Sequence, residues 1–285
     1  MRLLVVIVAF QSASVLKLTL RAVANQLDER DTLCVVNNAR EEAVANLVNQ
    51  LETRASVQFI SNEQNLGFTG GNNIGLRLGR WQDHEAVLLL NPDLLLPENW
   101  IDNGLALLAS RPELGIVSGP LVKYCFVREE SLDVVDSLGI QRRGLAPSWK
   151  DLGQGQSADS TLASYPRQWS PDAVCGALML IPRAAFTAVA QDGNLFDDAF
   201  FAYKEDIDLS LRMRKAGFRL LIDQALLAYH GRGWNLNRSE VPYSLRKLSS
   251  VNEVYLHYKH RSPYVIFSLL KMLYVRTIEK FRNHL

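Results

Sequence analysis

Long apolar runs are scarce in this chain. Although 48% of its 285 residues are hydrophobic, no stretch reaches the ~18 uninterrupted apolar residues that a membrane-spanning helix needs. The apolar start, Leu3 to Ala9, is short, and no small-residue cleavage site follows it, which argues against a secretory signal peptide. We interpret this start as a buried parallel strand, because it is rich in β-branched residues.

Cysteine and net charge are also low. The three cysteines, Cys34, Cys125 and Cys175, are scattered and lack metal-ligand spacing, so we expect reduced thiols in a cytosolic protein, most simply without a role. The chain has 31 Lys and Arg against 30 Asp and Glu, a formal net charge of +1. This balance gives no support for nucleic acid as the main partner. Internal repeats and low-complexity tracts are missing as well.

The first third of the chain alternates between two hydrophobic patterns. Strand-like runs cover residues 3–9, 32–36, 57–60 and 86–90, and helical patterns cover residues 15–27, 41–51 and 71–78. Such alternation predicts βαβ units and a mostly parallel sheet. Ligands of open α/β sheets bind beyond the carboxyl ends of the strands, so the segments that follow each strand are the candidate site.

The rest of the chain has weaker patterns. Residues 129–170 contain four glycines and two prolines among many polar residues, and we expect a long functional loop there. A second ordered block is expected at 173–229. From about Arg246 onward the sequence predicts a basic helical tail.

Two residues that follow strand-like runs are candidate metal ligands. Pro92 stops the strand that ends at Leu90, which places Asp93 at the sheet edge, where a carboxylate can bind a divalent cation and, through it, phosphate. His230 follows the run at 226–229, and an imidazole there can bind metal or phosphate. The alternatives are a turn-capping Asp93 and a structural His230.

Two further segments carry candidate chemistry. Residues 65–73 combine three glycines with asparagines, a composition that lets backbone approach a ligand before a helix N-terminus; a loop without a ligand is the alternative. Residues 196–209 hold five acids among aromatic side chains. Apolar surroundings raise the pKa of a carboxyl group, as a general base requires. The alternative is that these acids only stabilise the start of a helix.

Together these segments resemble the inverting family 2 glycosyltransferases with the GT-A fold, and most closely the bacterial rhamnosyltransferase-like branch. The resemblance rests on residues 65–73, 87–93, 175–183, 196–209 and His230, in matching order over residues 3–235. It implies an α/β GT-A fold, in which a Rossmann-like, mostly parallel sheet is flanked by helices and followed by a C-terminal helical extension.

The resemblance also implies a division of the chain and its cofactor. We expect residues 1–125 to form the nucleotide-sugar-binding half and 126–235 the acceptor-binding and catalytic half of one domain. Residues 236–285 would form a C-terminal, basic amphipathic helical segment. Mg²⁺ or Mn²⁺ would be held by Asp93 and His230. Asp93 is the second acid of the family's Asp-x-Asp motif, in which Asn91 replaces the first acid.

Individual site residues follow from the same resemblance. Asp206 would be the catalytic base, with Glu205 beside it. Tyr203 and Trp234 would contact the acceptor. The donor would be bound by Phe10, Gln11, Asn37, Asn65, Gly67, Gly71, Asn72 and Asn91. Many relatives carry an Asp where this chain has Asn37, so recognition of the nucleobase is expected to differ.

We therefore expect an inverting hexosyltransferase that uses a nucleotide-diphosphate sugar, with the resemblance favouring dTDP-rhamnose. Its acceptor would be a hydroxyl of a glycan or lipid-linked glycan in cell-surface polysaccharide synthesis. Two alternatives stay open: a nucleotidyltransferase on a related α/β fold, and a non-catalytic nucleotide- or glycan-binding protein at a membrane. Product analysis with activated sugars separates the three.

The C-terminal tail predicts a membrane partner. From Arg246 to the end there are eight basic residues against Glu253 and Glu279, a balance of 8 − 2 = +6. Apolar residues recur there at helical spacing. The sequence thus favours a cytoplasmic protein whose tail lies peripherally on an anionic inner membrane face. The alternative is a helix packed on the catalytic domain.

Overall fold

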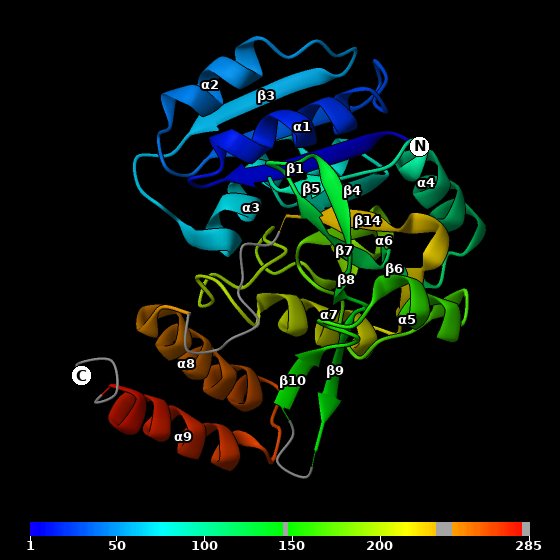
Figure 1. The fold of residues 1–285 in the computed structure, drawn as a ribbon. Coiled ribbons are helices and arrows are strands. Elements are labelled where there is room, and N and C mark those ends of the chain that lie inside the picture. Colours follow the sequence, from blue (N-terminus) through cyan, green and yellow to red (C-terminus); the bar gives the residue numbers. More distant parts are fainter. Residues whose placement is uncertain (145–147, 232–240, 281–285) are drawn as a thin grey trace.

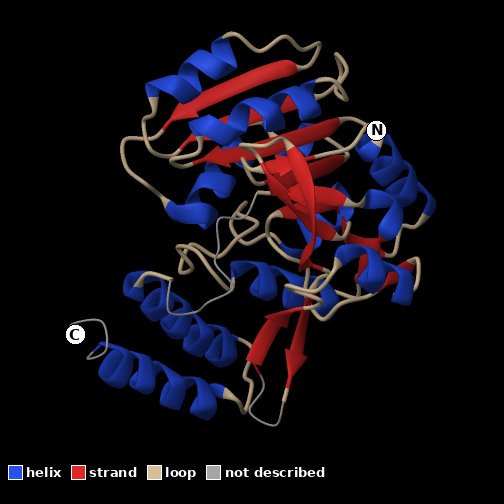
Figure 2. Cartoon of the chain, viewed as in Figure 1, coloured by secondary structure: helices blue, strands red, loops and turns tan. Residues whose placement is uncertain are grey.

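A central mixed sheet organises the molecule (Figures 1 and 2). The computed structural model describes residues 1–144, 148–231 and 241–280. The sheet has eight strands in the order β11-β13-β6-β12-β4-β1-β2-β3. Four of them are β1 (Leu3–Ala9), β2 (Thr32–Asn37), β3 (Ser56–Ser61) and β4 (Ala86–Leu90). These strands pair in parallel, close to the predicted ranges.

The other half of the sheet comes from later in the chain. Its strands are β6 (Leu114–Ser118), β11 (Gln168–Trp169), β12 (Leu178–Pro182) and β13 (Arg219–Asp223). β13 pairs with β6 in parallel, whereas β12 is antiparallel to both β4 and β6. Strands from both sides of residue 125 thus share one sheet. The division at residues 1–125, 126–235 and 236–285 stays a prediction.

Alternating side chains give each sheet face its own apolar core. In β1, Leu3, Val5 and Ile7 face α1 (Ala13–Ala24), α2 (Glu42–Asn49) and α4 (Trp100–Ser110). Leu4 and Val6 face the opposite core. That core includes residues of α3 (Gly67–Leu78), α6 (Arg183–Val189) and α7 (Glu205–Lys215). A strand buried on both faces reads as a continuous apolar run, which explains the sequence of β1.

The prediction of a long loop at residues 129–170 is wrong. The chain forms β8 (Glu130–Ser137), β9 (Ile140–Arg143), β10 (Ser148–Asp151), α5 (Ala158–Ser164) and β11 there. β8 joins a four-stranded sheet in the order β5-β14-β7-β8, with β5 (Leu94–Leu95), β7 (Leu121–Cys125) and β14 (Ala228–His230). These elements are too short and too polar to show a readable hydrophobic period.

The C-terminal part forms two helices that lie side by side at one end of the molecule (Figure 1). They are α8 (Tyr243–Lys259) and α9 (Val265–Tyr274), and the latter continues as a π-turn over Val275–Glu279. Within the described ranges, no helix combines the length and apolarity that crossing a membrane requires. The predicted helical tail is therefore present, and Tyr255 and Leu256 of its first helix pack against Phe200 and Ile207.

A buried charge cluster fastens α8 to α7. The fully buried Asp208 lies 2.8 Å from Arg212 on its own helix and 2.9 Å from both Lys259 and His260. Burial alone would raise the pKa of Asp208, but the hydrogen bond from His260 and the charges of Arg212 and Lys259 lower it to about 2. This acid of the 196–209 segment thus links two helices.

We expect Asp208→Asn to lower the free energy of unfolding at neutral pH by about 2 kcal/mol, the equivalent of such a pKa shift. Because the folded-state pKa lies below the usual 3.8, the contribution is complete above that pH and is lost as pH falls towards 2. Urea unfolding at neutral pH and at about pH 3 measures it. Asp102→Asn, on the exposed side of α4, is the control, and an equal loss at both pH values would contradict this origin.

Candidate active site

A pocket of about 650 Å³ lies where β1 and β4 end, and we call it the central pocket. It brings together residues predicted from distant parts of the sequence. Its lining includes Phe10, Gln11, Asn91, Asp93, Tyr203, Glu205, Asp206 and His230. The edge of the sheet therefore collects these residues, as expected for ligand sites of open α/β sheets.

A turn with strained backbone angles precedes the two acids Glu205 and Asp206 at the start of α7. Tyr203 and Lys204 have φ angles of +73° and +76° immediately before α7 begins at Glu205. For non-glycine residues this conformation costs ~1–3 kcal/mol each and is held by surrounding contacts. The buried Asn252 of α8 supplies two of them, because its Nδ2 donates to the backbone oxygens of Ala202 (2.8 Å) and Tyr203 (3.0 Å).

Glu205 and Asp206 both prefer the protonated state more than usual. Burial raises the pKa of Glu205 well above its usual value, and the charge of Asp206 raises it further. Burial also raises the pKa of Asp206, although the charge of Lys204 opposes the shift. A carboxylate with a raised pKa is a stronger general base, so the pair has the property that proton transfer requires.

Hydrogen bonds fix Asp206 more firmly than its neighbour. Its Oδ2 accepts from the Gly176 backbone N–H at 3.2 Å and its Oδ1 from the Ile207 N–H at 2.8 Å. A Cβ on Gly176 would stand 3.2 Å from the Cβ of Asp206, so glycine permits this approach. The Oε2 atom of Glu205 is buried and has no hydrogen-bond partner in the described residues. It thus remains available to a ligand.

Asp93 and His230 lie next to each other in the wall of the central pocket, with 3.3 Å between Asp93 Oδ1 and His230 Nε2. The other ring nitrogen, Nδ1, lies 2.8 Å from the fully buried Asp136 of β8. Burial alone would lower the pKa of His230, but the hydrogen bonds to Asp136 and Asp93 raise it to about 9. Asp136 was missed by the sequence reasoning, because β8 was expected to be loop.

One carboxylate and one neutral imidazole fit a divalent ion whose other ligands are diphosphate oxygens and water, and a metal at His230 would displace the proton that the raised pKa keeps on the ring. Asp136 fixes the ring and its tautomer so that Nε2 points to Asp93, the orienting role that carboxylates commonly have for metal-bound histidines. No group of three His, Cys, Asp or Glu side chains is placed around a single ion position in the described ranges. A metal here would therefore depend on the donor's oxygens.

A second pocket of about 540 Å³ continues from the central one, and we call it the asparagine pocket. It is lined by Asn38, Asn65 and Gly67 and shares Phe10, Gln11, Asn91 and Asp93 with its neighbour. Asn38 Nδ2 donates to Asn65 Oδ1 at 2.9 Å, and the Gly67 N–H donates to the same oxygen at 2.8 Å. This network shapes the side of the site assigned to the nucleotide.

Three predicted donor residues do not line either pocket. Asn37 is bonded to the Glu41 backbone through both side-chain ends. Asn72 Nδ2 donates to the Phe68 oxygen at 2.8 Å. Gly71 packs on β1, where a Cβ would meet Val8 at 2.6 Å. Their roles in donor binding stay predictions, and Asn38 takes the position expected of Asn37.

The remaining predicted residues lie as follows. Tyr203 lines both pockets and a smaller one of about 130 Å³ on the far side of the carboxylates, which Trp149 also lines. We call this third space the Trp149 pocket. Trp234 lies outside the described residues.

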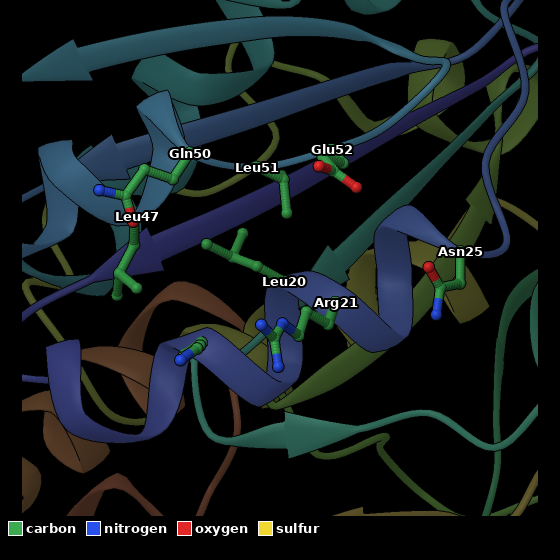
Figure 3. A pocket seen from close by; sticks show the side chains of 8 residues that line it. Leu20, Arg21, Asn25, Leu47, Gln50, Leu51 and Glu52 are labelled. Atoms are coloured by element: carbon green, nitrogen blue, oxygen red, sulfur yellow. The ribbon is translucent and has the colours of Figure 1, made fainter.

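One hollow of about 430 Å³ is separate from the site. It lies between α1 and α2, where Leu20 and Leu51 form its apolar floor and Arg21 and Gln50 its rim (Figure 3). It shares no lining residue with the central pocket. We assign it no part in the chemistry.

The order of these segments matches a known family. The model of the family described as "Glycosyltransferase like family 2" matches residues 2–240. The chain belongs to this family. A relative, the low-salt glycan biosynthesis hexosyltransferase Agl10 of Haloferax volcanii, is 22% identical over 242 residues, which cover 78% of this chain and 71% of the relative. The protein is therefore a glycosyltransferase with an α/β fold.

Solved structures show the same GT-A fold. The mannosyltransferase PcManGT of Pyrobaculum calidifontis, in complex with GDP-Man and Mn²⁺, has a TM-score of 0.58 at 16% identity, over 96% of this chain and 70% of that one. GalNAc-T7 with UDP, GalNAc and Mn²⁺ has a TM-score of 0.55 at 17% identity, over 88% and 48%. S. aureus TarS with UDP-GlcNAc has 0.53 at 15%, over 89% and 66%.

Proposed function

We propose that this glycosyltransferase moves a hexose from a nucleotide-diphosphate donor to an acceptor hydroxyl with inversion at the anomeric carbon. The observation that carries the proposal is the central pocket, where the Glu205–Asp206 pair and the Asp93–His230 pair line one space. One pair suits proton transfer, and the other suits a metal-bound diphosphate.

The reaction is a single displacement. Asp206 accepts the proton of the acceptor hydroxyl, whose oxygen bonds to the anomeric carbon on the face opposite the leaving group. The bond between that carbon and the diphosphate oxygen breaks, and its electron pair leaves with the nucleotide. Mg²⁺ or Mn²⁺ held by Asp93 and His230 would neutralise charge on the diphosphate. Glu205, whose Oε2 lacks a hydrogen-bond partner among the residues that the structure describes, hydrogen-bonds the acceptor.

The donor we propose is dTDP-rhamnose, on the sequence resemblance alone. The similar structures were solved with GDP-Man, UDP with GalNAc, and UDP-GlcNAc, so the nucleobase and the sugar are the variable parts. The exposed Phe10 and the amides of Asn38 and Asn65 line the nucleotide side. Phe10 offers a stacking surface, and the Nδ2 group of Asn65 offers a hydrogen-bond donor, which suit a thymine base.

Product analysis tests this function. The purified protein is incubated with dTDP-rhamnose, GDP-mannose or UDP-GlcNAc and simple glycoside acceptors, and products are read by mass spectrometry and NMR. A new glycosidic bond with inverted anomeric configuration supports the proposal, and retention would overturn the mechanism. Pyrophosphate release from a nucleoside triphosphate would favour a nucleotidyltransferase, and binding without turnover would favour a non-catalytic protein.

Helix α9 supports a membrane-bound acceptor. Its outer face is apolar, with Ile266 63%, Leu270 60% and Leu273 52% exposed. The same face includes Phe267, Leu269, Tyr274 and Ile278. Exposed apolar patches of this kind mark interaction surfaces.

Charge on the two helices favours an anionic lipid surface. Both acids point inward, because Glu253 pairs with Lys271 and Glu279 pairs with Arg246 at 3.0 Å. Arg276 and Lys280, which follow α9 along the chain, are exposed. Apolar burial combined with cations is how interfacial helices bind anionic membranes.

We expect the protein to float with phosphatidylglycerol vesicles and to float less at high salt. The triple variant Ile266→Ser, Leu270→Ser and Leu273→Ser should lose at least about tenfold in vesicle binding, since burial of each CH₂ contributes ~0.8 kcal/mol. Val127→Ser, at a residue 95% exposed elsewhere, is the control. If the triple variant floats like wild type, or if it instead loses self-association, the membrane surface is not α9.

A further inference from the structure

A fifth hollow, of about 470 Å³, lies where β9 and β10 meet the turn between α8 and α9, and we call it the basic pocket. Four of its lining side chains are basic: Arg142, His257, His260 and Arg261. None of its lining residues is acidic. A concave surface with this composition suits an anionic group.

The two guanidinium groups are available to a ligand. Arg142 stacks over the Tyr264 ring at 5.2 Å, and Arg142 and Arg261 are both exposed. Within the described part of the chain, neither is paired with a carboxylate. His260 is held by Asp208 at 2.9 Å. Burial lowers the pKa of His257, with the charge of Glu253 opposing the shift, so the positive charge of the pocket comes mainly from Arg142 and Arg261.

Trp149 connects this pocket to the catalytic carboxylates. Its side chain lines both the basic pocket and the Trp149 pocket, whose lining also includes Glu205 and Asp206. The indole Nε1 is buried and has no hydrogen-bond partner in the described residues. Burying a donor without a partner is unfavourable, and an acceptor oxygen on a ligand would satisfy it.

We propose that the basic pocket binds a phosphate or diphosphate group of the sugar acceptor. This inference rests on the proposed function and names its acceptor class as a phosphate-linked glycan. The acceptor hydroxyl lies at Asp206, its sugar contacts Trp149, and its phosphate binds Arg142 and Arg261. The basic pocket shares no lining residue with the central pocket or the asparagine pocket, so it is distinct from the site proposed for the donor diphosphate. It also adjoins the start of α9, whose apolar face would hold a lipid attached to that phosphate.

The first experiment measures binding of inorganic pyrophosphate by calorimetry in excess EDTA, which suppresses metal-dependent binding at Asp93. The double variant Arg142→Gln and Arg261→Gln should lose at least about tenfold in affinity, because charge-assisted hydrogen bonds contribute ~1.5–3 kcal/mol each. The matched control is Arg143→Gln, on the same strand, whose guanidinium bonds Gln141 and does not line the pocket. Equal pyrophosphate affinity in the double variant and wild type would overturn the proposal.

The second experiment separates an acceptor phosphate from a lipid headgroup. If the double variant loses pyrophosphate binding but floats normally with phosphatidylglycerol vesicles, the pocket serves the acceptor. Loss of both would assign it to headgroups and overturn the acceptor role.

A third measurement compares transfer to a sugar phenyl phosphate with transfer to the methyl glycoside of the same sugar. Wild type should favour the phosphate in kcat/KM, and the double variant should lose that preference through KM. Failure of all transfer would count against the proposed function, whereas transfer without a phosphate preference would count against this pocket alone.

Discussion

Replacing Asp206 by asparagine is expected to lower turnover by ~10²–10⁴-fold, the usual effect of losing a general base. The isosteric amide can keep the bond from the Gly176 N–H but cannot accept the hydroxyl proton. Donor binding should stay near wild type, because the role proposed for Asp206 is on the acceptor. Steady-state turnover and calorimetric binding of dTDP and UDP measure the two effects separately.

Stability provides a further readout for Asp206. Burial raises its pKa, so the charged form destabilises the folded state above the usual pKa and this penalty disappears as pH falls. The asparagine variant should therefore be at least as stable as wild type at neutral pH, with a melting temperature that is equal or a few degrees higher. Turnover within about threefold of wild type, in a folded variant, would remove Asp206 as the base and leave Glu205 as the candidate.

Removal of the metal is expected to abolish transfer, and Mn²⁺ or Mg²⁺ should restore it. Asp93→Asn should lower metal-dependent affinity for dTDP or UDP by about 10²-fold, since a neutral amide replaces the one charged ligand. Asp136→Asn should have a smaller effect, about 10–100-fold in metal affinity, because it acts through the orientation of His230. Mn²⁺ titration followed by electron paramagnetic resonance reports affinity directly.

The control for Asp136 is Asp133→Asn on the same strand, because Asp133 bonds Ser157 and the Asp159 N–H instead of the site. Its Mn²⁺ affinity should match wild type. Full activity in excess EDTA would show that the diphosphate is bound without a metal. Equal Mn²⁺ affinity in Asp136→Asn and wild type would show that His230 is oriented by other contacts.

The sequence predicted those parts of the fold that have a clear hydrophobic period. The run at Leu3–Ala9 is β1 without a shift, because a strand buried on both faces is apolar throughout. The pair of strands β9 and β10 was missed, since each has four residues and carries charged side chains. Their pairing is set by tertiary contacts, such as the bridge between Ile140 and Ala173.

Residues of the candidate site could likewise be predicted only where the local sequence carries a recognisable pattern. Asp93 and His230 could be selected because each stands at the end of an apolar run, and they meet because β14 pairs with β5, which begins directly after Asp93. Asp136 was not, because its partner His230 is 94 residues away and no local pattern marks it. Asn252 was equally hidden, since an asparagine within a helix gives no sign that its amide supports a turn 49 and 50 residues earlier.

The hydrogen bonds from Asn252 show that the region matched by the family model does not contain every residue that supports the candidate site. The family match ends at residue 240, whereas α8 begins at Tyr243. A chimera that took only the matched region would inherit Asp93, Glu205, Asp206 and His230 but not the amide that holds the left-handed turn before α7. We expect such a chimera to relax that turn and misplace its carboxylates, so α8 must be transplanted together with the motif it supports.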